Sequence, residues 1–159
     1  MDPLLQLLEE NARLTNAQLA AMLAVSEAEV AKRIEAYEQA GIIRGYQAAV
    51  DWERTDRERV QAIIEVKISP KAENGFDETA NLISQFPEVE SCYLMSGGYD
   101  VAVMVNGRTF QEIAYFVSHK LAPLEGVQQT GTHFVLRKYK DRGLAMEQEE
   151  DLREDLGKC

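Results

Sequence analysis

One short segment has residue types that could bind a small charged molecule, Gly97-Gly98-Tyr99-Asp100. Glycine lets backbone amides approach a carboxylate closely, and an aspartate beside them can pair with an ammonium group. Because a free amino acid carries both charges, the segment predicts a site for such a ligand. The alternative is a plain glycine turn between two strands, in which Asp100 bonds only to local amides.

Residue types that hold metals or perform catalysis are scattered through the sequence. His119 and His133 are far apart, without Cys, Asp or Glu at metal-ligand spacing. Cys92 and Cys159 show no metal spacing and no disulfide framework, so reduced thiols are expected. There is no nucleophile elbow, phosphate loop or dinucleotide fingerprint. We therefore expect no enzyme, no metal site and no cofactor.

The elements that must position the glycine segment follow a strand-helix-strand pattern that occurs twice over residues 60–140. Alternating apolar residues predict the first strand, and apolar residues at helical spacing predict each helix. The expected strands cover 62–68, 89–95, 101–105 and 127–139, and the expected helices cover 76–86 and 110–121. Two such halves predict a ferredoxin-like βαββαβ sandwich, so the fold class is α+β.

Residues 1–50 have the pattern of three short helices. The first begins at Pro3, and capping boxes at Thr15 to Gln18 and at Ser26 to Glu29 predict the starts of the next two. Two capped helices joined by a tight turn predict a helix-turn-helix. Gly41 suits the end of the third helix, and residues 42–46 read as a strand and turn that could form a wing.

The third helix supplies most of the candidate DNA contacts, because the second helix of such a motif lies in the major groove. If Val30, Ile34 and Tyr37 face inward, Lys32 faces outward and Arg33 lies at the flank. Arg44 in the expected wing could hold a phosphate. The candidate DNA-binding residues are Ser26, Ala28, Lys32, Arg33 and Arg44.

The charge of the chain weighs against strong electrostatic attraction to DNA. The net charge over 159 residues is −10, and Glu27, Glu29, Glu35 and Glu38 leave the third helix acidic. Because affinity for DNA comes largely from cations that neutralise phosphates, an alternative stays open. In that alternative the chain is an acidic partner subunit, whose helical head binds protein or a paralogue.

The expected domain organisation follows shifts in composition. Residues 1–50 form the DNA-binding domain, 51–59 a highly charged linker, 60–140 the sandwich and 141–159 an acidic tail. No apolar run is long enough to span a bilayer, and the N-terminus lacks the pattern of a secretory signal. We therefore expect a cytoplasmic protein without a membrane partner.

Taken together, the motifs resemble the leucine-responsive and asparagine-regulator (Lrp/AsnC) family of prokaryotic transcription factors over residues ~3–143. The resemblance rests on three groups of residues: the helix-turn-helix with its exit at Gly41, the Gly97 to Asp100 segment, and the closing stretch from Thr130 to Lys140.

The resemblance implies a sequence-specific regulator of double-stranded DNA. It also implies a winged helix-turn-helix, dimerisation through the sheet, assembly into octamers or similar rings, and an amino-acid effector at subunit interfaces. By the same resemblance, Thr130 and Thr132 border the effector pocket together with Gly97, Gly98, Tyr99 and Asp100.

Overall fold

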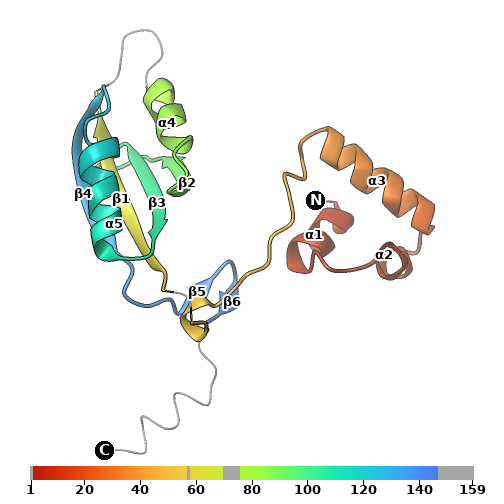
Figure 1. The fold of residues 1–159 in the computed structure, drawn as a ribbon. Helices are drawn as coiled ribbons and strands as arrows, with labels where there is room; N and C mark the ends of the chain where they lie inside the picture. Colours follow the sequence, from red (N-terminus) through yellow and green to blue (C-terminus); the bar gives the residue numbers. More distant parts are fainter. Residues whose placement is uncertain (1, 57, 70–75, 147–159) are drawn as a thin grey trace, which may run out of the picture. The chain divides into compact units, whose positions relative to one another are not determined.

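The chain forms two compact units in a computed structural model that describes residues 2–56, 58–69 and 76–146 (Figure 1). The first, Met1–Ala49, is called the head unit, and the second, Val50–Cys159, is called the sheet unit. The charged stretch 51–59, expected as a linker, falls in the sheet unit, where Trp52–Arg54 form a short 3-10 helix, η1. Residues 147–159 of the expected acidic tail lie outside the described residues.

The head unit contains the three expected helices, α1 (Pro3–Glu10), α2 (Asn16–Leu23) and α3 (Glu27–Gln39). The capping box at Thr15 is confirmed, since Thr15 Oγ1 accepts from the Gln18 amide and Gln18 Oε1 accepts from the Thr15 amide. At the start of α3 the Ser26 half of the expected box forms, with Ser26 Oγ accepting from the Glu29 amide at 3.2 Å. Each cap satisfies a backbone donor that the first helical turn leaves free.

The helix-turn-helix is confirmed, but the strand expected over residues 42–46 is not formed. Gly41 ends α3 with a φ of +67°, a left-handed conformation that glycine adopts without strain. The amides of Ile42 and Ile43 then both donate to the Tyr37 carbonyl, which ties these residues back to α3. A strand also needs a partner strand, and the described part of the head unit contains none.

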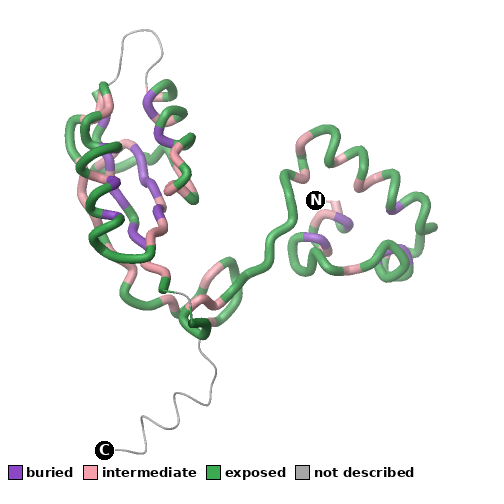
Figure 2. The backbone as a smooth tube through the Cα atoms, viewed as in Figure 1, coloured by how far each residue is buried: buried purple, intermediate pink, exposed green. Residues whose placement is uncertain are grey.

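The core of the head unit is small. Five hydrophobic residues of the three helices are buried together: Leu4, Leu8, Leu19, Ala20 and Val30. Figure 2 shows the buried positions along the backbone in purple. Ile34 and Tyr37 pack against them partly buried, as the helical spacing predicted. This packing fixes which face of α3 is left exposed.

The sheet unit is a four-stranded antiparallel sheet with helices on one face (Figure 1). The strand order is β2-β3-β1-β4. The strands are β1 (Val60–Ile68), β2 (Val89–Leu94), β3 (Val101–Gly107) and β4 (Val127–Phe134). The helices are α4 (Asp77–Ser84) and α5 (Phe110–Phe116), and a π-helical turn, η2 (Val117–Leu121), continues α5. The α+β ferredoxin-like fold is therefore confirmed.

The two faces of the sheet differ in burial because side chains alternate along each strand. On β1, Ala62, Ile64 and Val66 are fully buried beneath α4 and α5. Ile63 and Lys67, on the opposite face, are exposed. The face of Ile63 and Lys67 carries no helix in the described part of the chain and is called the open face.

The last strand is shorter than the sequence suggested, because β4 ends at Phe134 rather than near 139. The Val135 amide still donates to the Gln61 carbonyl, but β1 begins at Val60 and offers no partner beyond that point. The chain then forms a small hairpin of β5 (Lys140–Asp141) and β6 (Leu144–Ala145).

Candidate DNA-contact face and ligand-binding loop

The exposed face of α3 presents part of the predicted DNA-binding set. Ser26, Ala28 and Lys32 are all exposed, within the first two turns of the helix. Ser26 caps the helix with its hydroxyl, which fixes the direction in which the helix begins. The residues at the N-terminal end of such a helix reach base edges when it enters the major groove. Lys32 contributes the positive charge among these three residues.

Arg33, the other predicted cation of α3, is held inside the head unit. Its Nη2 lies 2.7 Å from both carboxylate oxygens of Asp2, and the Tyr37 hydroxyl donates to the same carboxylate. Asp2 Oδ1 also accepts from the Leu4 amide at 2.8 Å and so caps α1. The hydrogen bonds from Tyr37 and Arg33 lower the pKa of Asp2 to about 2. Arg33 therefore fastens α3 to the start of α1, and the prediction that it contacts DNA loses its geometric support.

Asp2 was not among the residues predicted from the sequence. Its role as helix cap could have been recognised, because it precedes Pro3 and proline favours the first helical position. Its ion pair with a residue 31 positions away leaves no sequence pattern.

Arg44 remains exposed beyond the end of α3. Its guanidinium lies against Gly41, where an added Cβ would come within 3.4 Å of the Arg44 Cζ atom. A cation beside a helix C-terminus is favoured by the helix dipole. Arg44 could still contact a phosphate from this position.

The acidic residues of α3 have local partners. The Glu38 carboxylate accepts from the Tyr46 hydroxyl at 2.9 Å, and the Glu35 carboxylate accepts from the Gln39 side-chain Nε2 at 3.1 Å. Neither donor is a cation, so neither of these bonds is an ion pair. The acidity noted in the sequence therefore persists on the exposed surface of the helix.

The loop between β2 and β3 holds Asp100 through three hydrogen bonds at the end of β1. Asp100 Oδ2 accepts from the Ile68 amide at 2.8 Å, its own amide donates to the Val66 carbonyl at 3.0 Å, and its carbonyl accepts from the Met95 amide at 2.8 Å. The side chain of Asp100 therefore bonds to the amide of a residue 32 positions away on β1, and not to a local amide as the turn alternative expected. Its Oδ1 accepts no hydrogen bond within the described part of the chain and stays available to a ligand.

The two glycines leave the backbone of this loop open. A Cβ added to Gly97 or Gly98 would meet no atom within 4 Å. Tyr99, next to them, is partly buried. The loop therefore combines accessible backbone with a fixed carboxylate.

Thr130 and Thr132 lie on β4, opposite Val66 and Ile64 of β1. Paired residues share a face in an antiparallel sheet, so both threonines are on the face covered by helices. Asp100 bonds to Val66 and Ile68, which brings Thr130 nearer to the loop than Thr132.

The described residues contain no group of three or more His, Cys, Asp or Glu side chains that could hold a metal ion. No helix formed by these residues is long and apolar enough to cross a membrane.

Comparison with protein families decides the identity of both units. Residues 61–145 match the Lrp/AsnC ligand binding domain, and residues 4–44 match a winged helix-turn-helix DNA-binding domain. The chain belongs to the Lrp/AsnC family of transcription regulators. As a member of this family it is a DNA-binding regulator with a ligand-binding domain, and it is not an enzyme.

Individual relatives match this Lrp/AsnC regulator over most of both chains. It is 43% identical over 149 residues to the uncharacterized HTH-type transcriptional regulator YugG of Bacillus subtilis, covering 93% of this chain and 90% of that protein. A Neisseria meningitidis regulator solved as a complex with L-Met is 32% identical, with a TM-score of 0.70, covering 89% of this chain and 93% of that one. E. coli AsnC is 26% identical, with a TM-score of 0.69, covering 91% of this chain and 97% of that one.

Proposed function

We propose that this regulator binds a specific operator through the exposed N-terminal half of α3. Ser26, Ala28 and Lys32 contact the major groove, and Arg44 holds a phosphate. Arg33 orients α3 by pairing with Asp2 instead of touching DNA. With so few cations, affinity falls with salt by a shallow slope of about 0.9 per phosphate neutralised.

The effector is a free amino acid bound at the Gly97 to Asp100 loop. The observation that carries this proposal is the fixed Asp100 carboxylate beside an open glycine backbone. The ammonium group pairs with Asp100 Oδ1 and the carboxylate accepts from the loop amides, while Tyr99, Thr130 and Thr132 border the pocket. The relative of known structure bound to L-Met supports this ligand class.

The open face of the sheet mediates dimerisation. It carries Ile63 and Tyr93, exposed to 37% and 53%, and the partly buried Met104 between them. These apolar side chains share the face with Glu65, Lys67 and His133, and a second copy that covers them stabilises the sheet. Dimers then assemble further, into an octamer by family resemblance, and the regulator acts in the cytoplasm.

Effector binding changes operator affinity through this assembly. The test measures L-methionine binding by calorimetry and operator affinity by electrophoretic shift, with the other proteinogenic amino acids as further probes. Asp100→Asn keeps the side-chain shape and one acceptor, and we expect it to lose both amino-acid binding and the effect on DNA. Lys32→Ala should weaken DNA binding and spare the effector, since linkage requires two distinct sites. Equal amino-acid binding by wild type and Asp100→Asn would show that the effector binds elsewhere.

A second function is favoured by the acidic surface of α3 and by the ion pair that Arg33 forms with Asp2. In this alternative the chain is a partner subunit whose head binds protein or a more basic paralogue. An operator shift by the purified chain alone, with a shallow salt slope, would exclude it.

A further inference from the structure

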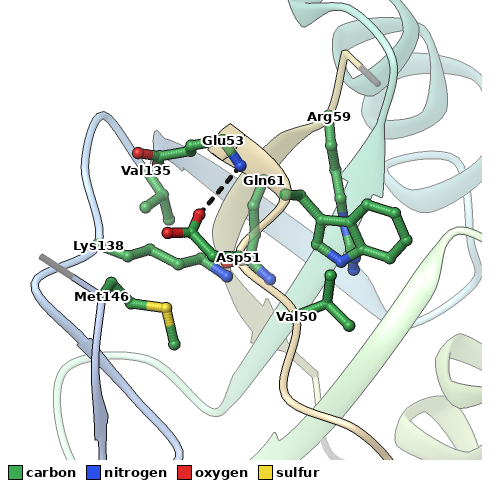
Figure 3. A pocket seen from close by; sticks show the side chains of 9 residues that line it. Val50, Asp51, Glu53, Arg59, Gln61, Val135, Lys138 and Met146 are labelled. Atoms are coloured by element: carbon green, nitrogen blue, oxygen red, sulfur yellow. Dashed lines mark hydrogen bonds between the residues drawn. The ribbon is translucent and has the colours of Figure 1, made fainter. Parts of the chain in front are cut away.

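The sheet unit contains a recess at the opposite end of β1 from Asp100. It lies between η1, the start of β1 and the segment that follows β4 (Figure 3). Its cavity volume is about 50 Å³, within a wider hollow of about 470 Å³ that includes open solvent. Gln61 and Val135 line it, and the Val135 amide donates to the Gln61 carbonyl at 2.8 Å. Ile68, which bonds to Asp100, lies seven positions beyond Gln61 along β1, or roughly 23 Å away. The recess is therefore distinct from the glycine loop.

Gln61 presents an acceptor to this recess. The residue is 7% exposed, and its Nε2 donates to Glu90 Oε2 at 2.7 Å. Because a carboxylate accepts only from the NH2 group, this bond fixes the amide orientation and turns Oε1 away from Glu90. Oε1 accepts no hydrogen bond from the described residues. Because the amide oxygen has no partner among the described residues, it can accept a hydrogen bond from a ligand in the recess.

Lys138 supplies positive charge to the same recess. Its Nζ donates to Asp141 Oδ2 at 3.1 Å, which leaves further ammonium protons available. Asp51 lies in the same wall, where Oδ1 accepts from the Glu53 amide (Figure 3) and Oδ2 lies 3.7 Å from Arg54 Nε. The recess thus offers a cation for a carboxylate, and an anion with an amide oxygen for an amine.

The rest of the wall combines apolar side chains with two further charged residues, Glu53 and Arg59. Val50, Trp52, Val135 and Met146 all line the recess, and the Trp52 ring is also covered by the Arg59 guanidinium at 5.3 Å. Small-molecule sites commonly combine such apolar walls with a few placed polar groups. Val50 and Trp52 also belong to the first residues after the head unit ends at Ala49.

We propose that this recess is a second ligand site, for a small molecule with one carboxylate, one amino group and an apolar side chain. The carboxylate binds Lys138, the amino group binds Gln61 Oε1 and Asp51, and the apolar side chain packs against Val135 and Trp52. A ligand held in this way orders the segment that leads to the head unit, independently of the glycine loop.

Trp52 makes the proposal directly testable, because it is the one tryptophan in the sequence. The full-length protein is titrated with L-leucine and with the other proteinogenic amino acids while Trp52 emission is followed. We expect a saturable change with at least one amino acid. For L-leucine, the half-ligands 4-methylpentanoate and 3-methylbutylamine lack one charged group each and should bind about tenfold more weakly or worse. Unchanged emission with every probe would overturn the proposal. So would half-ligands that both bind as tightly as L-leucine.

Variants assign the signal to the recess. Lys138→Met should weaken the binding seen by Trp52 about tenfold. The control Lys140→Met removes the same charge two residues away, outside the recess lining, and should bind as wild type does. Val135→Phe fills the recess and should abolish the signal even if Lys138→Met proves unstable.

The Asp100→Asn variant separates this site from the proposed effector site. It should keep the Trp52 response even where it loses amino-acid binding at the glycine loop. Loss of the Trp52 response in Asp100→Asn would mean that the signal comes from the loop. A response to protein concentration alone would mean that a second copy fills the recess. Either result rules out the second ligand site and leaves the proposed effector at Asp100 to be judged separately.

Discussion

The head unit and the sheet unit assemble their candidate sites in different ways. In the head unit, Ser26, Ala28 and Lys32 come from the start of a single helix, so helical spacing alone brings them to one face. In the sheet unit, Asp100 is held by Ile68, a residue 32 positions away on another strand. The units also differ in core size, with five buried hydrophobic residues in the cluster of the head unit and eleven in that of the sheet unit. The candidate DNA contacts of α3, which are easier to recognise in the sequence, therefore belong to the unit with the smaller hydrophobic core.

The largest expected effect comes from truncating a core side chain, which should destabilise one unit without destabilising the other. Leu19→Ala in the head unit and Ile64→Ala in the sheet unit each remove a fully buried side chain and cost about 2–5 kcal/mol. Leu19→Ala should abolish operator binding and leave unfolding followed by Trp52 emission unchanged, because Trp52 lies in the sheet unit. Ile64→Ala should lower the denaturant midpoint of the Trp52 transition. Equal shifts of that midpoint in both variants would mean that the units unfold as one.

A smaller effect tests the long-range packing of the sheet unit. Gly126 has a φ of +92°, and an added Cβ would lie 2.9 Å from Oγ1 of Thr79, which is buried. Gly126→Ala should cost about 2–4 kcal/mol from left-handed strain and overpacking together. Gly143→Ala is the matched control, with a φ of +83° and nothing within 4 Å, and should cost about 1–2 kcal/mol. Urea unfolding followed by Trp52 emission measures both, and a larger loss at Gly143 would contradict this account.

The two cations of α3 should behave differently although they are neighbours in sequence. Lys32→Ala should weaken operator binding by about 1–3 kcal/mol without changing the thermal stability of the head unit. Arg33→Ala should lower the melting temperature of the head unit, because it leaves the Asp2 carboxylate without its ion pair. Operator shifts and melting followed by circular dichroism compare the two. Should Arg33→Ala weaken operator binding while melting like wild type, Arg33 would be a DNA contact after all.

The smallest effect is a pH dependence confined to acid conditions. The folded head unit lowers the pKa of Asp2 from its usual 3.8 to about 2, so the unfolded chain binds this proton more readily. The stabilising contribution of Asp2 is therefore complete above about pH 4 and is lost as the pH falls toward 2. Asp2→Asn, which can still cap α1, should show less loss of stability over this window. Thermal melting from pH 5 to pH 2 provides the comparison. If the melting temperature falls with pH equally in both proteins, the Asp2 carboxylate does not stabilise the head unit through Arg33 and Tyr37.

Regular local patterns were enough to predict most of the secondary structure. Thr15 with Gln18, and Gly41 after α3, act on backbone groups within a few residues, so their effect is visible in sequence. The expected strand at 42–46 was wrong because strands need partners, and the amides of Ile42 and Ile43 return to Tyr37 instead. The last strand was predicted too long because the length of its partner β1 decides where it ends.

The sequence by itself determined the two-part organisation of helices followed by strand-helix-strand repeats, the glycine loop and the exposed face of α3. These follow from periodicity, caps and turn residues, which act over a few positions along the chain. Only the tertiary structure decided that Arg33 pairs with Asp2, that Asp100 is fixed by Ile68, and that Gln61 donates to Glu90. Each of these depends on which distant segments are brought within about 3 Å of one another, because a hydrogen bond or ion pair is decided by distance in space and not by separation along the chain.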